Sequence, residues 1–324
     1  MQQLAIYRTQ IEEGLQELAL DNQPRELYEP IRYTLELGGK RMRPILVLLA
    51  CDMVGGDGRH AIAPALGVEL FHNFTLLHDD IMDEAPLRRG QPTVYKKYNP
   101  NIAILSGDVM YTIACQQVAE APASVLKPVL DVFHDTAIKV CEGQQWDLNF
   151  ETDEQVAIEA YLEMIKLKTA VLLGGSLQMG ALIGGASANL AKDMYAIGVH
   201  LGLAFQLQDD ILDTYGDPEK FGKQVGGDII QNKKTYLLLQ AQQQANASQS
   251  ATLTHWLTVE SFQPETKVEA VKRIFDALNI REQAEAERDR HYDIAIKTLE
   301  ALTLPAEAKA PLQQLAAQLL NRDH

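Results

Sequence analysis

Apolar residues recur at intervals of three and four positions along most of the chain. This spacing predicts helices over residues 4–19, 27–37, 61–84, 101–119, 124–148, 154–173, 190–214, 233–246 and 264–320, with a break near Leu304 and Pro305. No segment alternates convincingly as a strand would. Segments 61–84 and 196–213 are apolar on most faces, so we expect them to be central helices. The pattern therefore predicts an all-α fold, a single large helical bundle.

The length of 324 residues fits either two domains of ordinary size or one large helical domain. The only polar interruptions are short turns such as "GGDGRH" and "ANASQS". No spacer rich in Ser, Gly or Pro separates the two halves of the chain. We therefore expect one domain over residues 1–324.

Composition narrows the possible functions. The formal net charge of −15 disfavours nonspecific nucleic-acid binding, so any anion site must be local. Cys51, Cys115 and Cys141 show no zinc-site spacing and are odd in number, which fits a reducing cytoplasm. The N-terminal segment is typical of an amphipathic helix and not of a signal peptide.

One segment, Thr169 to Ala191, has no formal charge and is long enough to cross a bilayer. Its five glycines, together with Ser176 and Gln178, instead suggest a buried helix pair that packs closely through small residues. We expect no membrane span.

The stretch "LLHDDIMDEAPLRRG" places three carboxylates on one helix face. Asp79 and Asp83 are four positions apart, and Asp80 and Asp83 are three apart. Each pair of like charges costs a helix about 0.2–0.5 kcal/mol. A solvated acidic helix end is the simplest interpretation of one such motif.

The same spacing returns about 130 positions later in "FQLQDDILD", which contains Asp209, Asp210 and Asp213. Both motifs follow a long apolar helix and precede a loop with basic residues. If the two helices lie side by side, only divalent ions could hold six carboxylates together. Oxygen ligands of this kind select Mg²⁺, which is commonly shared with substrate phosphates.

Basic residues gather in short loops of this acidic chain. In "LGGKRMRP", Gly38 and Gly39 are expected to end one helix and Pro44 to begin the next, which leaves Lys40, Arg41 and Arg43 between them. Such a loop is either a solvated turn or a site for an anion. Further basic residues follow in "PLRRGQPT", "MIKLKTA" and "FGKQVGGDIIQNKKT". Together they suit a substrate that carries a diphosphate.

These motifs, in this order, resemble those of the trans-type isoprenyl diphosphate synthases of the polyprenyl synthetase family. The resemblance runs from about Tyr28 to Thr235 and rests on "GGKRMRP", "DDIMD", "LRRGQPT", "KTA", "FQLQDDILD", "GKQVGGD" and "KKT". It implies one all-α bundle around a deep central cavity, in a homodimer. The family usually has proline two residues after the threonine of its last motif, where this chain has Leu237.

The resemblance also implies roles for individual residues. Three Mg²⁺ ions would be held by Asp79, Asp83 and Asp209. The carboxylates that support them, through water or by contact, would be Asp80, Asp210 and Asp213. The allylic substrate and its leaving diphosphate would be bound or oriented by Arg88, Lys168, Thr169, Gln206, Lys223 and Lys233. The isopentenyl diphosphate site would comprise Lys40, Arg43, His72 and Arg89. From spacing alone, His72 is more typical of a core histidine, and only the family resemblance favours a substrate-binding role.

The implied reaction joins isopentenyl diphosphate to an allylic diphosphate of C5 to C15. The allylic C–O bond breaks first, so metal ions and basic residues must neutralise the diphosphate that leaves. The carbocation must then meet the second substrate in a dry apolar cavity. No dedicated base is evident, and the released diphosphate is the expected proton acceptor.

Product length should depend on bulky residues along the helix before Asp79. Phe74, five positions earlier, is the first candidate for the cavity floor, although an ordinary core phenylalanine fits its position too. Thr75 is small and the first motif has no insertion, a combination that resembles enzymes making the C20 geranylgeranyl product. The alternative is a C15 farnesyl diphosphate synthase.

Two other functions use the same fold. A class I terpene cyclase would need no second diphosphate site, which Lys40, Arg43, His72 and Arg89 argue against. A noncatalytic partner subunit would be expected to have lost one acidic motif, and both are complete here.

Overall fold

The computed structural model describes residues 2–153, 155–217 and 225–320. By their packing these residues form two compact units. The first comprises residues up to Ala137, Gly175–Tyr195 and Thr303–Pro311, and the second comprises Ile138–Gly174, Ala196–Leu302 and residues from Leu312. Helices α7, α9, α10 and α17 contribute to both units. The expectation of one domain over 1–324 stays a prediction.

The first unit contains α1 (Gln2–Gln16), α2 (Arg25–Glu36), α3 (Met42–Met53), a 3₁₀ turn (Gly58–Ala61), α4 (Ile62–Met82), β1 (Leu87–Arg88), β2 (Gln91–Pro92), α5 (Val94–Lys97) and α6 (Pro100–Ala119). The helices that both units share are α7 (Leu126–Thr152), α9 (Val171–Ile183), α10 (Ala188–Tyr215) and α17 (Ala306–Leu320). The second unit adds α8 (Ile158–Ile165), a π-helical turn (Lys166–Ala170), α12 (Gly227–Ile230), α13 (Tyr236–Gln244), α14 (Ala247–Thr258), α15 (Pro264–Ala277) and α16 (Ile280–Ala301).

The all-α prediction is confirmed, and most expected helices occur within a few residues of their predicted ends. Helix α14 was missed because its sequence lacks a clear apolar period. The expected helix over 264–320 is three helices, with an extra break at Leu278 and Asn279. The expectation of no strand was wrong at one place, where β1 and β2 form a short antiparallel ribbon.

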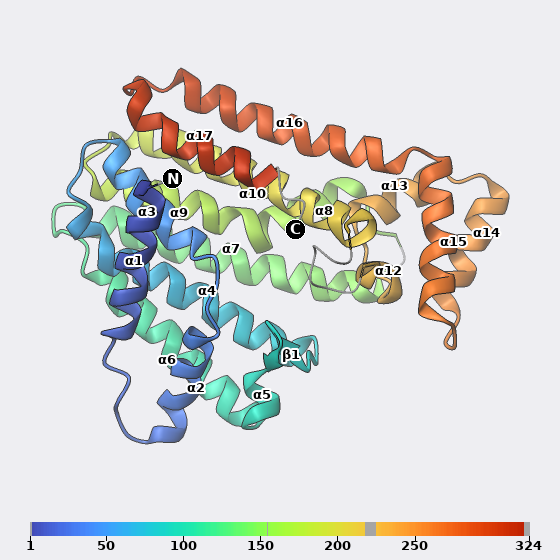
Figure 1. Cartoon of the computed structure of the whole chain (residues 1–324), viewed down its shortest axis with the longest axis horizontal. Coiled ribbons are helices and arrows are strands. Elements are labelled where there is room, and N and C mark those ends of the chain that lie inside the picture. The colour runs from blue at the N-terminus through green and yellow to red at the C-terminus, as the bar shows by residue number, and fades with distance from the viewer. Residues whose placement is uncertain (1, 154, 218–224, 321–324) are drawn as a thin grey trace. The chain divides into compact units, whose positions relative to one another are not determined.

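Helix α4 is the centre of the first unit, as its apolar composition predicts. Its residues from Pro64 to Phe71 are all buried. It packs along α6, and Figure 1 shows the two helices beside each other. Two glycines allow this approach: a Cβ at Gly67 would lie 2.6 Å from Val118, and one at Gly107 would lie 2.3 Å from His78.

Small residues of α9 bring it close to α3. Helix α3 is buried from Pro44 to Cys51. A Cβ added at Gly180 would lie 2.1 Å from the carbonyl oxygen of Val47 and 2.9 Å from the Cβ of Ala50. The glycines of segment 169–191 therefore act in helix packing, as expected.

The second unit places short helices around the C-terminal half of α10. Helix α15 contacts α12, α13, α14 and α16. Figure 1 shows α14 and α15 side by side at the right of the view.

Among the described residues, one helix has the length and hydropathy of a membrane span. This helix is α6 and not the uncharged segment 169–191 that was considered from the sequence. Packing against the central helix α4 accounts for part of the apolar composition of α6, while Ile104 and Leu105 remain exposed.

Replacing Gly180 by Ala should destabilise the protein. The new methyl group cannot avoid the Val47 backbone, so the helices must separate, and overpacking of this kind costs about 1–3 kcal/mol. Chemical denaturation measures the loss. The exposed α14 residue Thr254 provides the control, since Thr254→Ala should change the unfolding free energy by no more than about 0.5 kcal/mol. Equal stability of the two variants would contradict the close contact.

Candidate active site

The first acidic motif forms the C-terminal end of α4. Asp79 and Asp80 belong to its last turn, and Asp83 ends the helix by donating its backbone N–H to the Asp79 carbonyl, at 2.8 Å. Asp83 is exposed and Asp79 partly exposed, whereas Asp80 is buried. The outer two carboxylates are therefore accessible and the middle one is not.

Arg88 binds the buried Asp80. Its Nε lies 2.9 Å from each oxygen of the carboxylate, and its Nη2 lies 2.7 Å from Oδ1. Paired contacts of this geometry are the strongest that arginine makes with a carboxylate. Arg88 was predicted to bind the allylic diphosphate, and one side of its guanidinium is already engaged.

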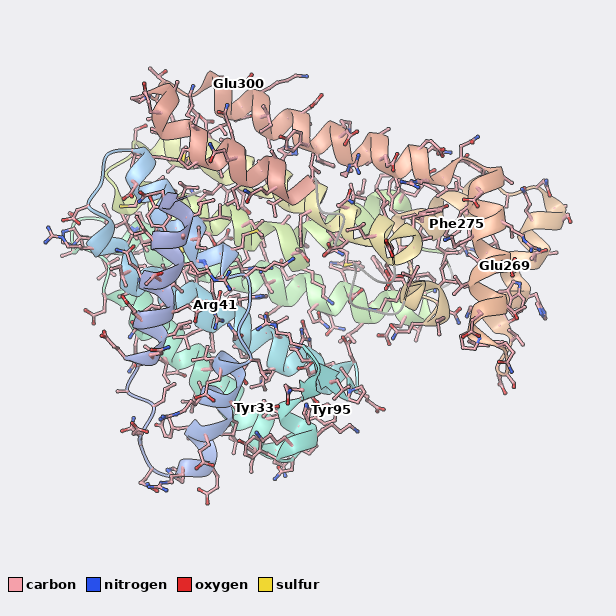
Figure 2. The ribbon with its side chains drawn as sticks, viewed as in Figure 1. Tyr33, Arg41, Tyr95, Glu269, Phe275 and Glu300 are labelled. Atoms are coloured by element: carbon pink, nitrogen blue, oxygen red, sulfur yellow. The ribbon has the colours of Figure 1, made fainter. Side chains whose placement is uncertain are left out.

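A tight turn positions Arg88 and the neighbouring Arg89. The φ angles of Arg89 and Gly90 are 53° and 76°, so the two-residue turn between β1 and β2 fits the type I′ geometry common in hairpins. The hydroxyl of Tyr33, which Figure 2 labels, donates to the Pro92 carbonyl at 2.7 Å and ties the ribbon to α2.

The "LGGKRMRP" loop joins α2 to α3 through backbone that favours glycine. The φ angles of Gly38, Gly39 and Arg41 are 77°, 149° and 49°. A Cβ at Gly39 would lie 2.9 Å from the guanidinium of Arg89, so this glycine makes room for that side chain. Lys40 is exposed on the same loop.

Arg41 does not face solvent as its place in a basic loop suggests. It is buried, and Figure 2 labels it in the first unit. Its guanidinium donates to Glu12 at 3.0 Å, to the buried Glu69 at 2.8 Å and to the Leu35 carbonyl at 2.7 Å. Arg41 therefore anchors the loop to three helices, while Lys40 and Arg43 remain as candidate anion ligands.

Arg43 and His72 lie together behind this loop. The Nη1 of Arg43 is 3.1 Å from the Nε2 of His72. Burial lowers the pKa of Arg43 to about 10. Burial also lowers the pKa of His72 well below its usual value, and the charges of Arg43, Arg89, Arg88 and Arg41 lower it further. A neutral His72 can accept a hydrogen bond from Arg43.

Arg43 also has a hydrogen-bond donor that pairs with no described residue. Within the described part of the chain, the buried Nε of Arg43 finds no hydrogen-bond partner. A buried donor left in this way costs free energy until an acceptor arrives. The structure thus brings Arg43, His72 and Arg89 together in a cationic cluster, and we call these three residues the arginine–histidine cluster.

The second acidic motif occupies the last turns of α10, in the second unit. Asp209 and Asp213 are partly exposed and Asp210 is buried. Tyr161 of α8 donates its hydroxyl proton to one Asp210 oxygen, and Gln206 Nε2 donates to the other at 3.2 Å. Asp213 accepts the backbone N–H of Asp228 at 2.9 Å. Again the middle aspartate is held by the protein.

The middle aspartates differ in their partners. Burial raises the pKa of Asp210 to about 8, and the Asp228 carboxylate adds to the rise. Asp80, in contrast, is paired with Arg88. Burial and the Asp210 charge raise the pKa of Tyr161 as well. The carboxylate of Asp210 is thus opposed by neutral donors, whereas that of Asp80 is opposed by a guanidinium.

Lys168 and Thr169 lie in the π-helical turn between α8 and α9. Turns of this kind are frequent at functional sites. Lys168 Nζ is 2.5 Å from Asp147 of α7, and Thr169 donates to Gln206 at 3.3 Å. The turn presses against Gly143, where a Cβ would lie 2.2 Å from the Lys168 nitrogen. Thr169, Gln206 and Asp210 thus form one hydrogen-bonded chain.

Lys233 is about half exposed, with its Nζ 4.0 Å from an Asp228 oxygen. It follows α12 and precedes Thr235, whose hydroxyl caps α13. The other predicted lysine of this region, Lys223, lies outside the described residues.

Several partners of these groups carry no motif of their own. Tyr161, Asp147 and Glu69 were not singled out in the sequence. Gln144, one turn before Asp147, has both amide atoms buried without a hydrogen-bond partner among the described residues. The polar run "EGQQWD" within an otherwise amphipathic helix was the one signal that pointed to it.

The carboxylates suit metal ions that bring other ligands with them. Over the described ranges, no three His, Cys, Asp or Glu side chains converge on a single metal position. Mg²⁺ keeps several waters and binds through one or two carboxylates and substrate phosphates. The accessible outer aspartates of each motif fit that kind of binding.

An aromatic cluster lies along α4 before the first motif. The ring of Phe74 stacks on Tyr111 of α6, with centroids 5.3 Å apart, and contacts His78 at 4.8 Å. Phe71 lies 5.7 Å from both Phe74 and Tyr111, and it contacts Phe133 of α7 at 5.6 Å. Phe74 is thus one part of a continuous aromatic layer.

Comparison with known proteins gives a consistent result. A family model described as polyprenyl synthetase matches residues 24–277. A geranylgeranyl diphosphate synthase from Methanosarcina mazei is 41% identical over 234 residues, which cover 71% of this chain and 72% of that protein. A crystal structure of a geranylgeranyl pyrophosphate synthase is 43% identical with a TM-score of 0.94, covering 98% of each chain. A polyprenyl synthase from Caulobacter crescentus, solved with calcium and isoprenyl diphosphate, is 25% identical with a TM-score of 0.88, covering 100% of this chain and 98% of that one.

Stability should fall with decreasing pH through His72. Its pKa is lowered in the folded protein, so the unfolded chain, with a histidine pKa of about 6.5, binds the proton first. Well above pH 6.5, His72 causes no loss of unfolding free energy. Below pH 6.5, the unfolding free energy falls by at most about 1.4 kcal/mol for each pH unit. His72→Gln removes this contribution, so denaturation between pH 8 and 5 should show a shallower slope in the variant. Equal slopes would mean that His72 takes up its proton normally in the folded state.

Proposed function

The chain belongs to the polyprenyl synthetase family, and on this premise we propose that it condenses isopentenyl diphosphate with allylic diphosphates of C5 to C15. The main product proposed is geranylgeranyl diphosphate, C20. The arginine–histidine cluster carries this proposal. This cluster is a positively charged site that could bind an anion, and it is separate from the Asp80–Arg88 pair. An enzyme that elongates a prenyl chain needs such a second site for a diphosphate. A terpene cyclase has no use for it.

We assign the substrates as the sequence resemblance implies. Isopentenyl diphosphate would bind Lys40 and the arginine–histidine cluster. The allylic diphosphate would bind the accessible part of Arg88 together with Lys168, Thr169, Gln206 and Lys233, and with Lys223 from outside the described residues. The Arg43 Nε, which is buried and has no acceptor among the described residues, supports the first assignment.

Magnesium is the proposed cofactor, with three ions held by Asp79, Asp83 and Asp209. When bound, it would neutralise charge on the diphosphate that leaves. Asp80, Asp210 and Asp213 would hold their neighbours in place, which the protein contacts of these three carboxylates support. The accessibility of Asp79, Asp83 and Asp209 agrees with their assignment as ligands.

The chain's own residues account for the remaining chemistry. As the allylic C–O bond breaks, Lys168, Lys233 and Arg88 stabilise the developing negative charge on the diphosphate oxygens. The double bond of isopentenyl diphosphate then attacks the allylic carbon and forms the new C–C bond. Loss of a proton to the released diphosphate restores a neutral chain with one more double bond. Apolar residues keep water from the cation.

The C20 assignment follows from the resemblance at Thr75 and the first motif, and the aromatic layer supplies a candidate for the limit of chain growth. Phe74 is partly exposed, whereas Phe71 behind it is buried. A growing chain along α4 would meet the Phe74–Tyr111 stack first and Phe71 next. The first ring pair would therefore set the limit of growth.

We also propose a homodimer in a cytoplasmic location. The side chains of Ile104 and Leu105 on α6 are 44% and 57% exposed, which supports a partner on that helix. The three cysteines are all free thiols, which supports a reducing compartment.

Purified protein should make C20 product from isopentenyl diphosphate and a C15 primer only with Mg²⁺ present. Asp79→Asn and Asp209→Asn should each lower kcat by about 10²- to 10³-fold, because each removes a group that acts on the leaving diphosphate. Asp131→Asn is the control, since Asp131 is an exposed α7 residue paired with Lys127. Product analysis by mass spectrometry provides the measurement, and activity that survives chelation would overturn the metal assignment.

Replacing Phe74 by Ala should shift the products beyond C20. Removing one ring of the stack lets the chain pass Tyr111 as far as Phe71. Phe74→Met keeps most of the side-chain volume, so its product lengths should stay close to those of the wild type. An unchanged distribution in Phe74→Ala would assign the limit to other residues.

A further inference from the structure

Lys267 of α15 is a fully buried lysine in the second unit. None of its surface is exposed. Its Nζ donates to the Ile230 carbonyl at 3.2 Å and to Asn232 Oδ1 at 2.6 Å, and it lies 4.3 Å from the centre of the Phe262 ring. Both hydrogen bonds therefore go to neutral oxygens.

Burying the charged Lys267 side chain costs more free energy than burying an apolar side chain of the same size. Among the described residues, the Lys267 ammonium bonds to neutral oxygens only, and a buried ammonium in that setting loses its hydration with little compensation. Burial correspondingly lowers the pKa of Lys267. A methionine of similar length would fill the same volume without that cost. The presence of an amine at this position is therefore best explained by the two hydrogen bonds that it donates.

Lys267 holds the loop that leaves α12. Ile230 is the last residue of that helix, and Asn232 follows in a left-handed conformation with a φ of 59°. The Asn232 amide is fixed at both ends, because its Nδ2 donates to the Leu257 carbonyl at 3.1 Å while its Oδ1 accepts from Lys267.

The same loop carries groups of the second acidic motif. Asp228, in the first turn of α12, donates its N–H to Asp213 and accepts the N–H of Lys233 on its backbone carbonyl, each at 2.9 Å. Gly226, just before α12, packs against Val268, the neighbour of Lys267. Helix α15 therefore supports the loop from one side and Asp213 supports it from the other.

We propose that Lys267 is a positioning residue, which sets Lys233 and the Asp213–Asp228 contact for diphosphate binding. The proposal rests on the proposed function for the role of Lys233. Lys267 itself touches no substrate. Its contribution is the fixed path of residues 230–233.

The test uses Lys267→Met in the full chain. The variant keeps the length of the side chain and removes both hydrogen bonds. The KM for the allylic diphosphate should rise about tenfold or more, as is typical when a supporting partner of a ligand is lost, and the KM for isopentenyl diphosphate should change less than about twofold. Lys272→Met is the matched control. Lys272 lies on the same helix, near the Tyr215 ring, and donates neither of the two hydrogen bonds by which Lys267 holds residues 230 and 232.

Two measurements separate positioning from general damage. Hydrogen exchange should accelerate in residues 227–235 of Lys267→Met and stay as in the wild type elsewhere. Asn232→Gly keeps the left-handed backbone and removes the acceptor, so it should raise the allylic KM in the same way. Unchanged exchange and KM values in Lys267→Met would overturn the proposal, as would an equal rise in both KM values.

Binding of inorganic pyrophosphate with Mg²⁺, measured by calorimetry, keeps this test independent of turnover. Weaker binding in Lys267→Met than in Lys272→Met supports the positioning role even if the wild type makes no prenyl product. Equal binding in the two variants counts against it. A wild type without product refutes the proposed function alone.

Discussion

Repulsion between carboxylates at helix C-termini is the constraint on which the rest of this structure depends. Asp79, Asp80 and Asp83 end α4, and the second triplet ends α10. The last turn of a helix also carries the negative end of its dipole, so both terms disfavour anions there. A folded chain accepts such placement only with cations or strong donors nearby. Arg88 supplies a cation in the first unit, and Tyr161 with Gln206 supplies neutral donors in the second.

Because of that difference, we expect a bound metal ion to change the charge balance of the second motif more than that of the first. Asp80 is paired with Arg88, whereas burial and the Asp228 carboxylate raise the pKa of Asp210 to about 8. A divalent cation bound at Asp209 would lower that pKa again. The first motif is thus prepared before any ligand arrives, and the second completes its charge balance only with the ligand. Loop residues around Asp213 and Asp228 then matter more for the second motif.

Much of this architecture follows from local pattern, and the remainder depends on tertiary contacts. Helical spacing correctly predicts that Asp79 and Asp83 share a face, and paired glycines predict the break before α3. The burial of Arg41 could not be foreseen, because its partners Glu12 and Glu69 lie 29 and 28 positions away. Tyr161 and Lys267 were missed for the same reason. Helix α14 did carry a readable signal, the capping box of Asn246 and Gln249, although its apolar period is weak.

The residues that we propose for product length and for catalysis lie at separate places on one helix, and this separation has a physical consequence. The aspartates end α4, while Phe74 and Phe71 lie about one and a half and two turns earlier at 5.4 Å per turn. Charge acts on the diphosphate at one end, and shape acts on the hydrocarbon at the other. The Phe74–Tyr111 stack contains no group that the ionisation step requires. Its volume can therefore change without altering the electrostatics that drive the reaction. If Phe74 limits chain growth as proposed, product length would depend on side-chain packing, whereas the reaction would depend on the charged residues at the end of the helix.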